Sequence, residues 1–234
     1  MAPSDSAHTL AVPPFARGEA IWYGFGTRKL TWSGLKAQAA RRGLIPVSLQ
    51  QQHGDRLVRV EAAEDFPCPG DGLFTDRSGF LLVIKTADCL PVLLAEPQAG
   101  VVAAVHCGWR GTSQRILWKA VRFLKEKLGC RAERMQAALG PCIAASCYEV
   151  GREVLEAFAG EGMSPELFKE RAERPDKVLF DLREANRRQL REAGVPGGHI
   201  FSLSGCTHCQ KNLYSYRRDA QEAGRLLNFI GRIP

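Results

Sequence analysis

The sequence predicts an α+β fold, a single domain of mixed β-sheets flanked by helices. Several apolar stretches are long enough only for strands, while other segments repeat their apolar residues at helical spacing. The two kinds of segment do not alternate strictly, which favours α+β layers over a doubly wound parallel sheet. No linker composition divides the 234 residues. We therefore expect one domain over residues 19–234, preceded by a flexible Ala/Pro/Ser-rich lead-in over residues 1–18.

The expected strands lie mainly in the first half of the chain. Residues 56–60 alternate in polarity and predict a strand that leaves a turn around His53. Residues 80–84 and 91–95 predict two strands joined by a turn that contains Cys89. Residues 101–105 predict a strand buried on both faces, with His106 at its end, and residues 135–139 predict a further one.

The expected helices begin after His106. Residues 113–128 form the clearest one, with Thr112 as N-cap candidate and Gly129 as the C-terminal stop. Residues 181–193 begin with Asp181 and have Glu184 three positions later, as in a capping box. Residues 152–158 predict a shorter helix, and residues 219–229 a final one.

Composition limits the classes of partner. The net charge is +7 and the pI about 9.1, but the basic residues are dispersed in pairs with no aromatic-interleaved stripe. A solvated basic surface is therefore favoured over a nucleic-acid groove, and an anionic small substrate such as phosphate also suits the charge. The apolar stretches are too short to span a bilayer, and the N-terminus lacks a secretory pattern. We expect a cytoplasmic monomer whose eight cysteines are mainly thiols.

Three residues are the main candidates for chemistry: His53 in Q-Q-H-G-D, Cys89 in K-T-A-D-C-L-P and His106 in H-C-G-W-R-G. Each follows or precedes a short apolar stretch beside turn residues. Together they form either a cysteine–histidine nucleophile pair with a helper or a three-ligand metal site with one open position. The residues alone leave both interpretations open.

Neighbouring side chains fit a site around these three. Asp88 beside Cys89 and Asp55 beside His53 are candidate carboxylates for orienting a ring or binding a substrate hydroxyl. Arg110 offers a guanidinium suited to phosphate or carboxylate, although a surface ion pair explains it equally well. Residues 214–219, which include Arg217, form either a capped helix start or a wall of the substrate site.

The remaining cysteines give a weaker signal. Cys206 and Cys209 have C-x-x-C spacing, and Cys142 and Cys147 are possible partners in a structural zinc site. A second C-x-x-C is missing, so this site is not favoured. A thioredoxin-like role is favoured even less, because no βαβ unit frames the motif.

Several motifs in series resemble the YfiH/laccase-domain family. They are K-T-A-D-C-L-P-V-L-L, V-V-A-A-V-H-C-G-W-R-G-T, L-G-P-C-I, Y-E-V-G and Y-S-Y-R-R-D, and the resemblance covers roughly residues 22–232. Members of this family have been called polyphenol oxidases, purine nucleoside phosphorylases and peptidoglycan editing factors. The resemblance implies mixed sheets flanked by helices, distantly like the catalytic domain of bacterial deamidase toxins.

The resemblance also implies site residues and a cofactor. It implies that His53, Cys89 and His106 are zinc ligands and catalytic residues, that Arg28 contacts phosphate, and that Gln51 belongs to the family's Q-x-H-G. Asp88, Arg110 and Arg217 complete the expected substrate-binding set. Two departures stand out: residues 30–49 are compressed relative to the family, and Cys107 replaces the usual Ala.

The expected function depends on which metal, if any, the three residues bind. A multicopper cluster needs far more than the five histidines present, and a blue-copper site lacks an axial Met, so copper is the less favoured metal. We expect a zinc-dependent purine nucleoside phosphorylase that uses a nucleoside and phosphate, with adenosine deamination as a further activity. The alternatives are a metal-free Cys–His amidase of the peptidoglycan-editing type and a copper-dependent polyphenol oxidase.

Overall fold

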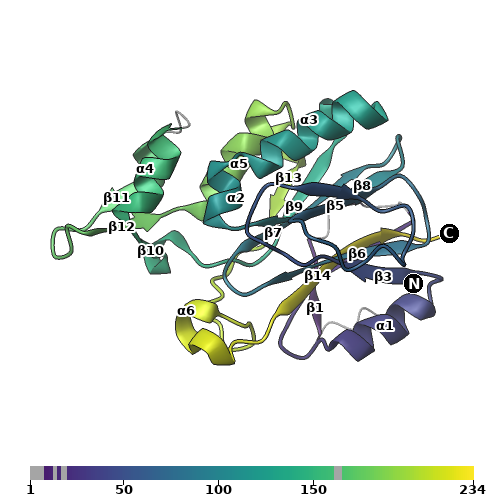
Figure 1. Ribbon diagram of the computed structural model, residues 1–234, viewed down its shortest axis with the longest axis horizontal. Helices are drawn as coiled ribbons and strands as arrows, with labels where there is room; N and C mark the ends of the chain where they lie inside the picture. The colour runs from purple at the N-terminus through teal and green to yellow at the C-terminus, as the bar shows by residue number, and fades with distance from the viewer. Residues whose placement is uncertain (1–7, 13–14, 17–19, 161–164) are drawn as a thin grey trace.

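Two β-sheets pack face to face in the middle of the molecule, and helices cover their outer faces (Figure 1). The computed structural model describes residues 8–12, 15–16, 20–160 and 165–234. This architecture confirms the predicted α+β class of mixed sheets flanked by helices.

The five-stranded sheet has the order β1-β2-β14-β6-β3, with β3 parallel to β6 and the other pairs antiparallel. Its strands are β1 (Thr9–Leu10), β2 (Ile21–Gly26), β14 (Leu226–Arg232), β6 (Phe80–Thr86) and β3 (Ile45–Ser48).

The six-stranded sheet has the order β13-β9-β7-β8-β5-β4. Its strands are β13 (Ile200–Ser202), β9 (Gln136–Leu139), β7 (Leu90–Glu96), β8 (Val101–Cys107), β5 (Gly72–Thr75) and β4 (Leu57–Arg59). A small third sheet contains β10 (Glu149–Gly151), β12 (Lys177–Phe180) and β11 (Phe168–Glu170).

Strand β7 holds the layers together because its side chains are buried on both of its faces. Val92 and Leu94 face the core beneath the helices, whereas Leu93 and Ala95 face the core between the two large sheets. Successive side chains of a strand point to opposite faces, so a strand buried on both faces reads as a continuous apolar run. Burial of each such side chain contributes roughly 1.5–3 kcal/mol.

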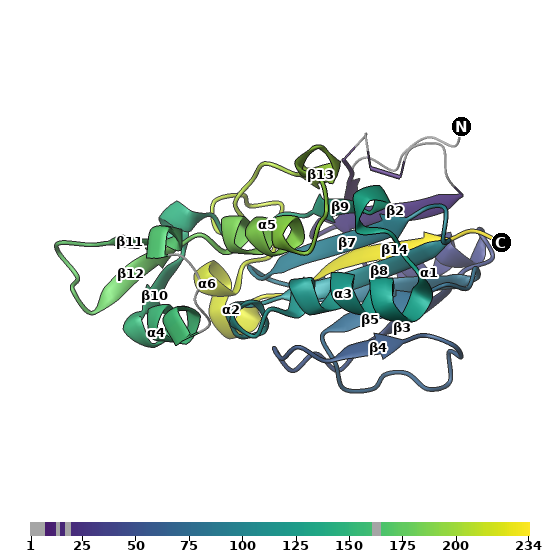
Figure 2. The ribbon, with the colours of Figure 1, turned by 90° about the horizontal axis from the view of Figure 1, so that it is seen from above.

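The helices occupy both outer faces. Helices α3 (Ile116–Leu128) and α5 (Leu182–Glu192) lie side by side over the six-stranded sheet (Figures 1 and 2). Helix α1 (Trp32–Ala40) covers the five-stranded sheet, with Leu35 and Ala39 buried against it. Helix α4 (Arg152–Gly160) projects at one end with the small sheet. No helix of the described ranges is long and apolar enough to cross a membrane.

The strands expected at residues 80–84, 91–95, 101–105 and 135–139 are present with slightly different bounds, and the strand at 56–60 is shorter. Asp181 caps α5 as predicted, because its carboxylate accepts the Glu184 N–H at 2.9 Å. The helix expected at 113–128 begins later, at Ile116, and Thr112, its expected N-cap, lies inside a preceding short helix. A five-residue helix, α2 (Trp109–Ser113), comes first, and Arg115 at φ 61° lies in the left-handed region before α3 starts.

The final helix predicted at residues 219–229 is wrong. Helix α6 (Tyr216–Asp219) ends where that helix was expected to begin, and β14 follows in the centre of the five-stranded sheet. Leu226, Phe229 and Ile230 are buried, because both faces of this strand are covered. A short apolar run does not distinguish a buried strand from a helix by periodicity alone.

The expected flexible lead-in at residues 1–18 falls partly outside the described residues. Within that range, Thr9–Leu10 pairs with β2, and Phe15 is buried against the core between the sheets.

Candidate active site

Three turns at one end of the two sheets bring His53, Cys89 and His106 together. His53 lies in the loop after β3, Cys89 directly precedes β7, and His106 is the penultimate residue of β8. Their possible ligand atoms all lie within 4.8 Å of one another. The two imidazole rings meet edge to face, with centroids 4.8 Å apart.

Successive side chains of β8 point to opposite faces of the sheet, and this alternation determines where His106 points. Val105 and Cys107 face the core beneath the helices, and Ala104 faces the core between the sheets. His106 therefore faces the space between the sheets, where it is 2% exposed. Cys107 points away from it, and burial raises the pKa of this thiol well above its usual value, so Cys107 stays protonated.

One buried carboxylate orients both histidines. Asp71 immediately precedes β5, and its Oδ1 lies 2.8 Å from His106 Nδ1. Oδ1 also accepts the His53 N–H at 3.0 Å, and Oδ2 accepts the N–H groups of Gln52 at 3.1 Å and Gly54 at 2.8 Å. The Asp71 bond occupies Nδ1 of His106, which leaves Nε2 for the cluster.

The pKa values of Asp71, Cys89 and His106 depend on one another. Burial raises the pKa of Asp71, but the hydrogen bond from His106 and the backbone N–H donors outweigh it and lower that pKa. Burial also raises the pKa of Cys89, whereas the charge and hydrogen bonds of His106 and His53 lower it to about 6. Burial lowers the pKa of His106, but Cys89 and Asp71 raise it. The arrangement therefore favours a thiolate at Cys89.

The cluster is closed on one side by Gly108. A Cβ at this position would lie 3.0 Å from His53 Nδ1 and 3.3 Å from Cys89 Sγ. Gly108 has an ordinary φ of −79°, so the need for glycine here is one of space and not of backbone conformation. His53 at φ 59° and Asp88 at φ 90° are in the left-handed region, a strained conformation often found at functional sites.

The cluster forms part of the wall of a cavity of about 460 Å³. This volume is in the range of small-molecule sites. Besides the three cluster residues, the lining includes cationic, aromatic and acidic side chains: Lys85, Arg217, Arg225, Tyr148, Tyr216 and Asp88.

Two predicted site residues line this cavity but use their polar atoms to hold the wall. Gln51 accepts the Lys85 N–H at 2.7 Å and donates to the Lys85 carbonyl at 2.8 Å, which fastens the His53 loop to β6. Asp88 accepts from Thr207 Oγ1 at 2.6 Å and from the Arg217 N–H at 2.7 Å. Arg217 extends its guanidinium near the Tyr148 ring, 5.7 Å from the centroid.

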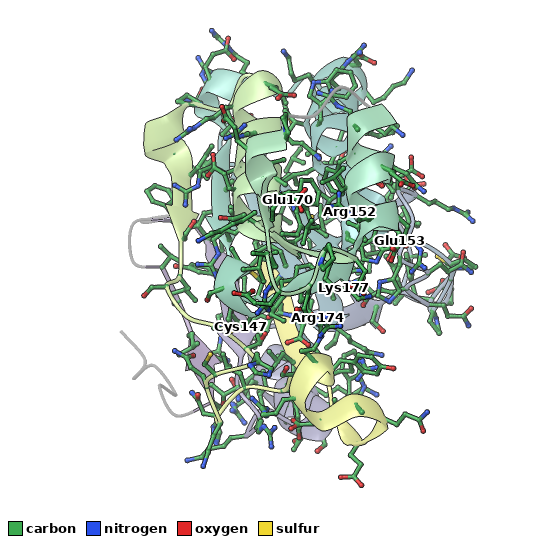
Figure 3. The ribbon with its side chains drawn as sticks, turned by 90° about the vertical axis from the view of Figure 1, so that its left-hand side faces the viewer. Cys147, Arg152, Glu153, Glu170, Arg174 and Lys177 are labelled. Atoms are coloured by element: carbon green, nitrogen blue, oxygen red, sulfur yellow. The ribbon has the colours of Figure 1, made fainter. Side chains whose placement is uncertain are left out.

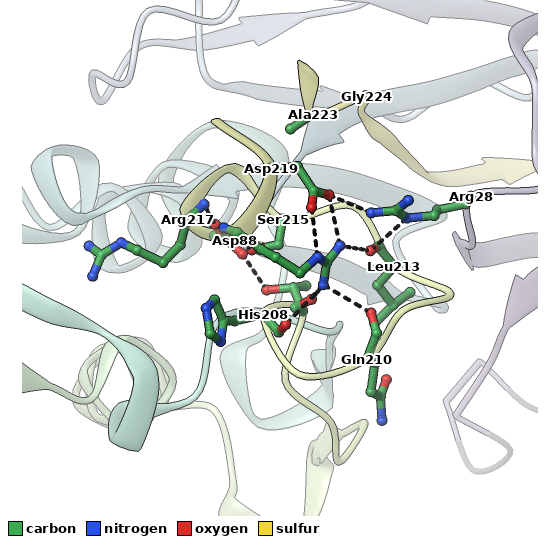
Figure 4. Close-up of polar contacts among 12 residues, drawn as sticks. Arg28, Asp88, His208, Gln210, Leu213, Ser215, Arg217, Asp219, Ala223 and Gly224 are labelled. Carbon is green, nitrogen blue, oxygen red and sulfur yellow. Dashed lines mark hydrogen bonds and ion pairs between the residues drawn. The ribbon is translucent and has the colours of Figure 1, made fainter. Parts of the chain in front are cut away.

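Arg28 and Arg110 are not among the residues that line this cavity. Arg28 forms an ion pair with Asp219 and donates to the Leu213 carbonyl at 3.0 Å (Figure 4), and it borders a neighbouring groove. Arg110 lies over the ring of Trp109, 4.5 Å from its centroid. Asp55 pairs with Lys119 on the surface and is not the carboxylate that orients His53.

Sequence reasoning missed Asp71, Lys85, Tyr148 and Arg225, whereas Tyr216 belongs to residues 214–219, which the sequence already offered as a wall of the site. Asp71 had the best available signal, because an acidic residue between two glycines directly before a buried strand is unusual. The others come from segments far apart in the chain, and only the packing of the sheets brings them to one cavity.

Two imidazoles and a thiolate-forming cysteine fit a transition-metal ion, because nitrogen and sulfur donors at this separation can reach a common centre. The same geometry also places Asp71, His106 and Cys89 in the order of an orienting acid, a base and a nucleophile.

The structure thus defines a protein with mixed sheets flanked by helices and a two-histidine, one-cysteine centre in a small-molecule cavity. The family model described as "Multi-copper polyphenol oxidoreductase laccase" matches residues 34–233. The chain belongs to this YfiH/laccase-domain family.

The chain is also similar to named relatives. It is 42% identical over 183 residues to a Deinococcus radiodurans "Purine nucleoside phosphorylase", covering 78% of this chain and 68% of the relative. It is 40% identical over 163 residues to "Adenosine deaminase RL5" from an unknown prokaryotic organism, covering 69% of this chain and 62% of that protein.

The fold is similar to solved structures over nearly its whole length. The crystal structure of YlmD from Geobacillus stearothermophilus has a TM-score of 0.86 at 30% identity, covering 99% of this chain and 98% of that one. The hypothetical protein YfiH from Bacillus licheniformis has a TM-score of 0.87 at 26% identity, covering 98% of both chains.

Proposed function

We propose that the protein is a zinc-dependent purine nucleoside phosphorylase that converts a purine nucleoside and phosphate to the free base and ribose 1-phosphate. One observation carries the proposal: a single cavity joins the His53–Cys89–His106 cluster to the cations Lys85, Arg217 and Arg225 and to tyrosine rings. The names of the relatives support the same substrate class.

His53, Cys89 and His106 would hold the zinc. Cys89 ligates as the thiolate that its lowered pKa favours, and His106 ligates through Nε2 because Asp71 occupies Nδ1. When bound, zinc supplies a Lewis acid that polarises a substrate oxygen.

The polar and aromatic walls position the two substrates. The cationic groups of Lys85, Arg217 and Arg225 attract the phosphate dianion, and Arg217 is anchored through its backbone N–H to Asp88. The exposed ring of Tyr216 and the partly buried ring of Tyr148 offer flat faces for a purine. Holding both substrates in one cavity converts a bimolecular reaction into an effectively unimolecular one.

The reaction is balanced without an external reagent. A phosphate oxygen forms a bond to the anomeric carbon of the ribose, and the bond from that carbon to the purine nitrogen breaks. The electron pair goes to the purine ring, which takes up the proton that hydrogen phosphate loses. The cavity cations offset the charge of the phosphate while this occurs. Arg28 and Arg110 lie outside the cavity, and we assign them no contact with the reacting groups.

Adenosine deamination is a second activity that the same site would support, and the relative named adenosine deaminase favours it. The Asp71–His106–Cys89 arrangement supports a different candidate, a metal-free amidase in which Cys89 attacks an acyl carbon. The name of the family, by contrast, describes a copper oxidoreductase. We propose zinc over copper because the chain has only five histidines.

One experiment separates these candidates. Purified protein is analysed for bound metals and assayed on inosine, adenosine, guanosine, a phenol and a muropeptide, with Cys89→Ala as the blank. We expect zinc, and release of hypoxanthine from inosine only when phosphate is present. Turnover of the phenol with copper bound, or of the muropeptide after zinc removal, would assign the protein to another class.

A further inference from the structure

A second group of metal-ligating side chains lies outside the cavity. Cys147 ends the short turn η2 (Ala145–Cys147), and His208 and Cys209 lie in the loop between β13 and α6. The possible ligand atoms of these three residues lie within 4.8 Å of one another, and the sulfurs of Cys147 and Cys209 are 3.5 Å apart. Figure 3 looks onto the end of the molecule that carries Cys147. The proposed phosphorolysis uses none of these residues.

Cys206 lies outside this 4.8 Å group but next to its Cys209 member, and it offers a fourth donor. Its sulfur accepts the Ala144 N–H at 3.2 Å, and the N–H groups of His208 and Cys209 also point to it. It lies within hydrogen-bonding reach of the Cys209 sulfur. Backbone donors directed at a sulfur favour its thiolate form, which is the form that binds metal.

We propose that Cys147, Cys206, His208 and Cys209 form a second, structural zinc site, called here the thiol cluster. Three thiolates and one imidazole make a closed tetrahedral set of the kind found in structural zinc sites. Zinc–sulfur bonds of about 2.3 Å in a tetrahedron place two sulfurs roughly 3.8 Å apart, close to the separation of Cys147 and Cys209.

Cys142, a possible ligand on sequence grounds, is not part of the thiol cluster. It is fully buried, and its sulfur accepts from Arg183 Nη2 at 3.4 Å. Burial raises the pKa of this thiol to about 11, against the opposing effect of Arg183. Its backbone forms a bridge with Cys206 and its carbonyl accepts the Thr207 N–H, so Cys142 supports the loop without ligating.

The thiol cluster joins two walls of the catalytic cavity. Cys147 is followed by Tyr148, which lines the cavity. Cys206 is followed by Thr207, whose hydroxyl donates to Asp88 beside Cys89 (Figure 4). Arg218 donates to the carbonyls of Thr207 and His208, which ties the same loop to α6. Zinc in the thiol cluster would therefore hold Tyr148 and the Asp88 anchor at a fixed separation.

The test compares zinc content among single and double variants of the full chain. Reduced protein is loaded with zinc, passed through a desalting column and analysed by mass spectrometry of the metal. We expect about two zinc ions per wild-type chain, about one in Cys209→Ser, about one in His53→Ala and none in the double variant. Cys68→Ser, which alters a partly buried cysteine outside both clusters, is the matched control and should bind as the wild type does.

A second readout tests the structural role. Cobalt-loaded His53→Ala should show intense thiolate-to-cobalt absorption that disappears when Cys147 or Cys206 is also changed to Ser. Cys209→Ser should lower the melting temperature and raise KM for the nucleoside more than it lowers kcat, because it loosens the wall that carries Tyr148.

Three results would overturn the proposal. The first is equal zinc content in the wild type and Cys209→Ser. The second is loss of cobalt absorption in His53→Ala alone. The third is a Cys147–Cys209 disulfide as the state of protein kept under reductant and zinc, which would assign the pair to redox chemistry. A protein that binds zinc at the thiol cluster but lacks phosphorolysis would refute only the proposed function.

Discussion

Asp71→Asn tests how the site is positioned, because the substitution keeps the volume of a side chain that is 1% exposed and removes one acceptor. Each Asp71 oxygen accepts two hydrogen bonds. Oδ1 accepts from His53 N and His106 Nδ1, and Oδ2 accepts from the backbone of Gln52 and Gly54. An Asn amide group must face one of these two pairs.

Both orientations of the new amide damage the site. If it faces the backbone of Gln52 and Gly54, two partly buried donors lose their acceptor and the His53 loop is loosened. If it faces His106, Nδ1 must accept and the proton moves to Nε2, where it blocks ligation. Loss of two partly buried hydrogen bonds costs about 1–3 kcal/mol, at roughly 0.5–1.5 kcal/mol for each bond.

The assay is zinc affinity by chelator competition, together with kcat/KM and thermal melting. We expect zinc affinity to fall about 10–100-fold, as for other residues that orient ligating histidines. Asp55→Asn is the matched control: it makes the same change two residues from His53, on a carboxylate that pairs with Lys119 at the surface. An Asp71→Asn affinity within about twofold of that control would refute the assigned role of Asp71.

Gly108→Ala should weaken zinc binding at least about tenfold with little change in melting temperature, because its Cβ would press on His53 Nδ1 and Cys89 Sγ. Gly198→Ala, whose Cβ would meet nothing within 4 Å, is the control, and unchanged zinc affinity in Gly108→Ala would contradict the close approach of Gly108 to the cluster. In zinc-free protein, the rate of alkylation of Cys89 by iodoacetamide should increase as pH rises through about 6, because the pKa of this thiol is lowered and the thiolate predominates above that pH. A midpoint near the ordinary pKa of a thiol would argue against the His106–Cys89 pairing. Arg217→Gln should raise KM for phosphate about tenfold or more, measured by kinetics at varied phosphate, while zinc content stays constant. An unchanged KM for phosphate would show that Arg217 does not bind phosphate.

The sequence predicted the grouping of His53, Cys89 and His106 better than the residues packed around it. Each of the three stands where an apolar run meets a turn, and these positions together with the family resemblance pointed to a shared site, while their role as metal ligands stays a prediction. Asp71 acts through contacts with residues 17 to 35 positions away, and no local pattern predicts which turn it will meet. Asp55 was the nearer carboxylate in the chain, yet a surface lysine is its partner.

In the fold, too, local patterns predicted some elements, and long-range contacts decided others. The strands β6, β7 and β8 were evident because burial on both faces requires continuous apolar runs. The apolar run of strand β14 also fits a helix, because its pairing with β2 and β6 depends on residues about 140 or more positions away. The left-handed conformation of Arg115, after which α3 begins, likewise leaves no mark in the residue type.

We propose that phosphate-dependent cleavage of the nucleoside requires zinc at His53, Cys89 and His106. The most direct measurement follows inosine and phosphate by phosphorus-31 resonance in zinc-free protein, before and after zinc is restored. We expect ribose 1-phosphate to appear only after zinc is added, only with phosphate present, and not with Cys89→Ala. Full activity in zinc-free protein, or release of hypoxanthine without a phosphate ester, would contradict it.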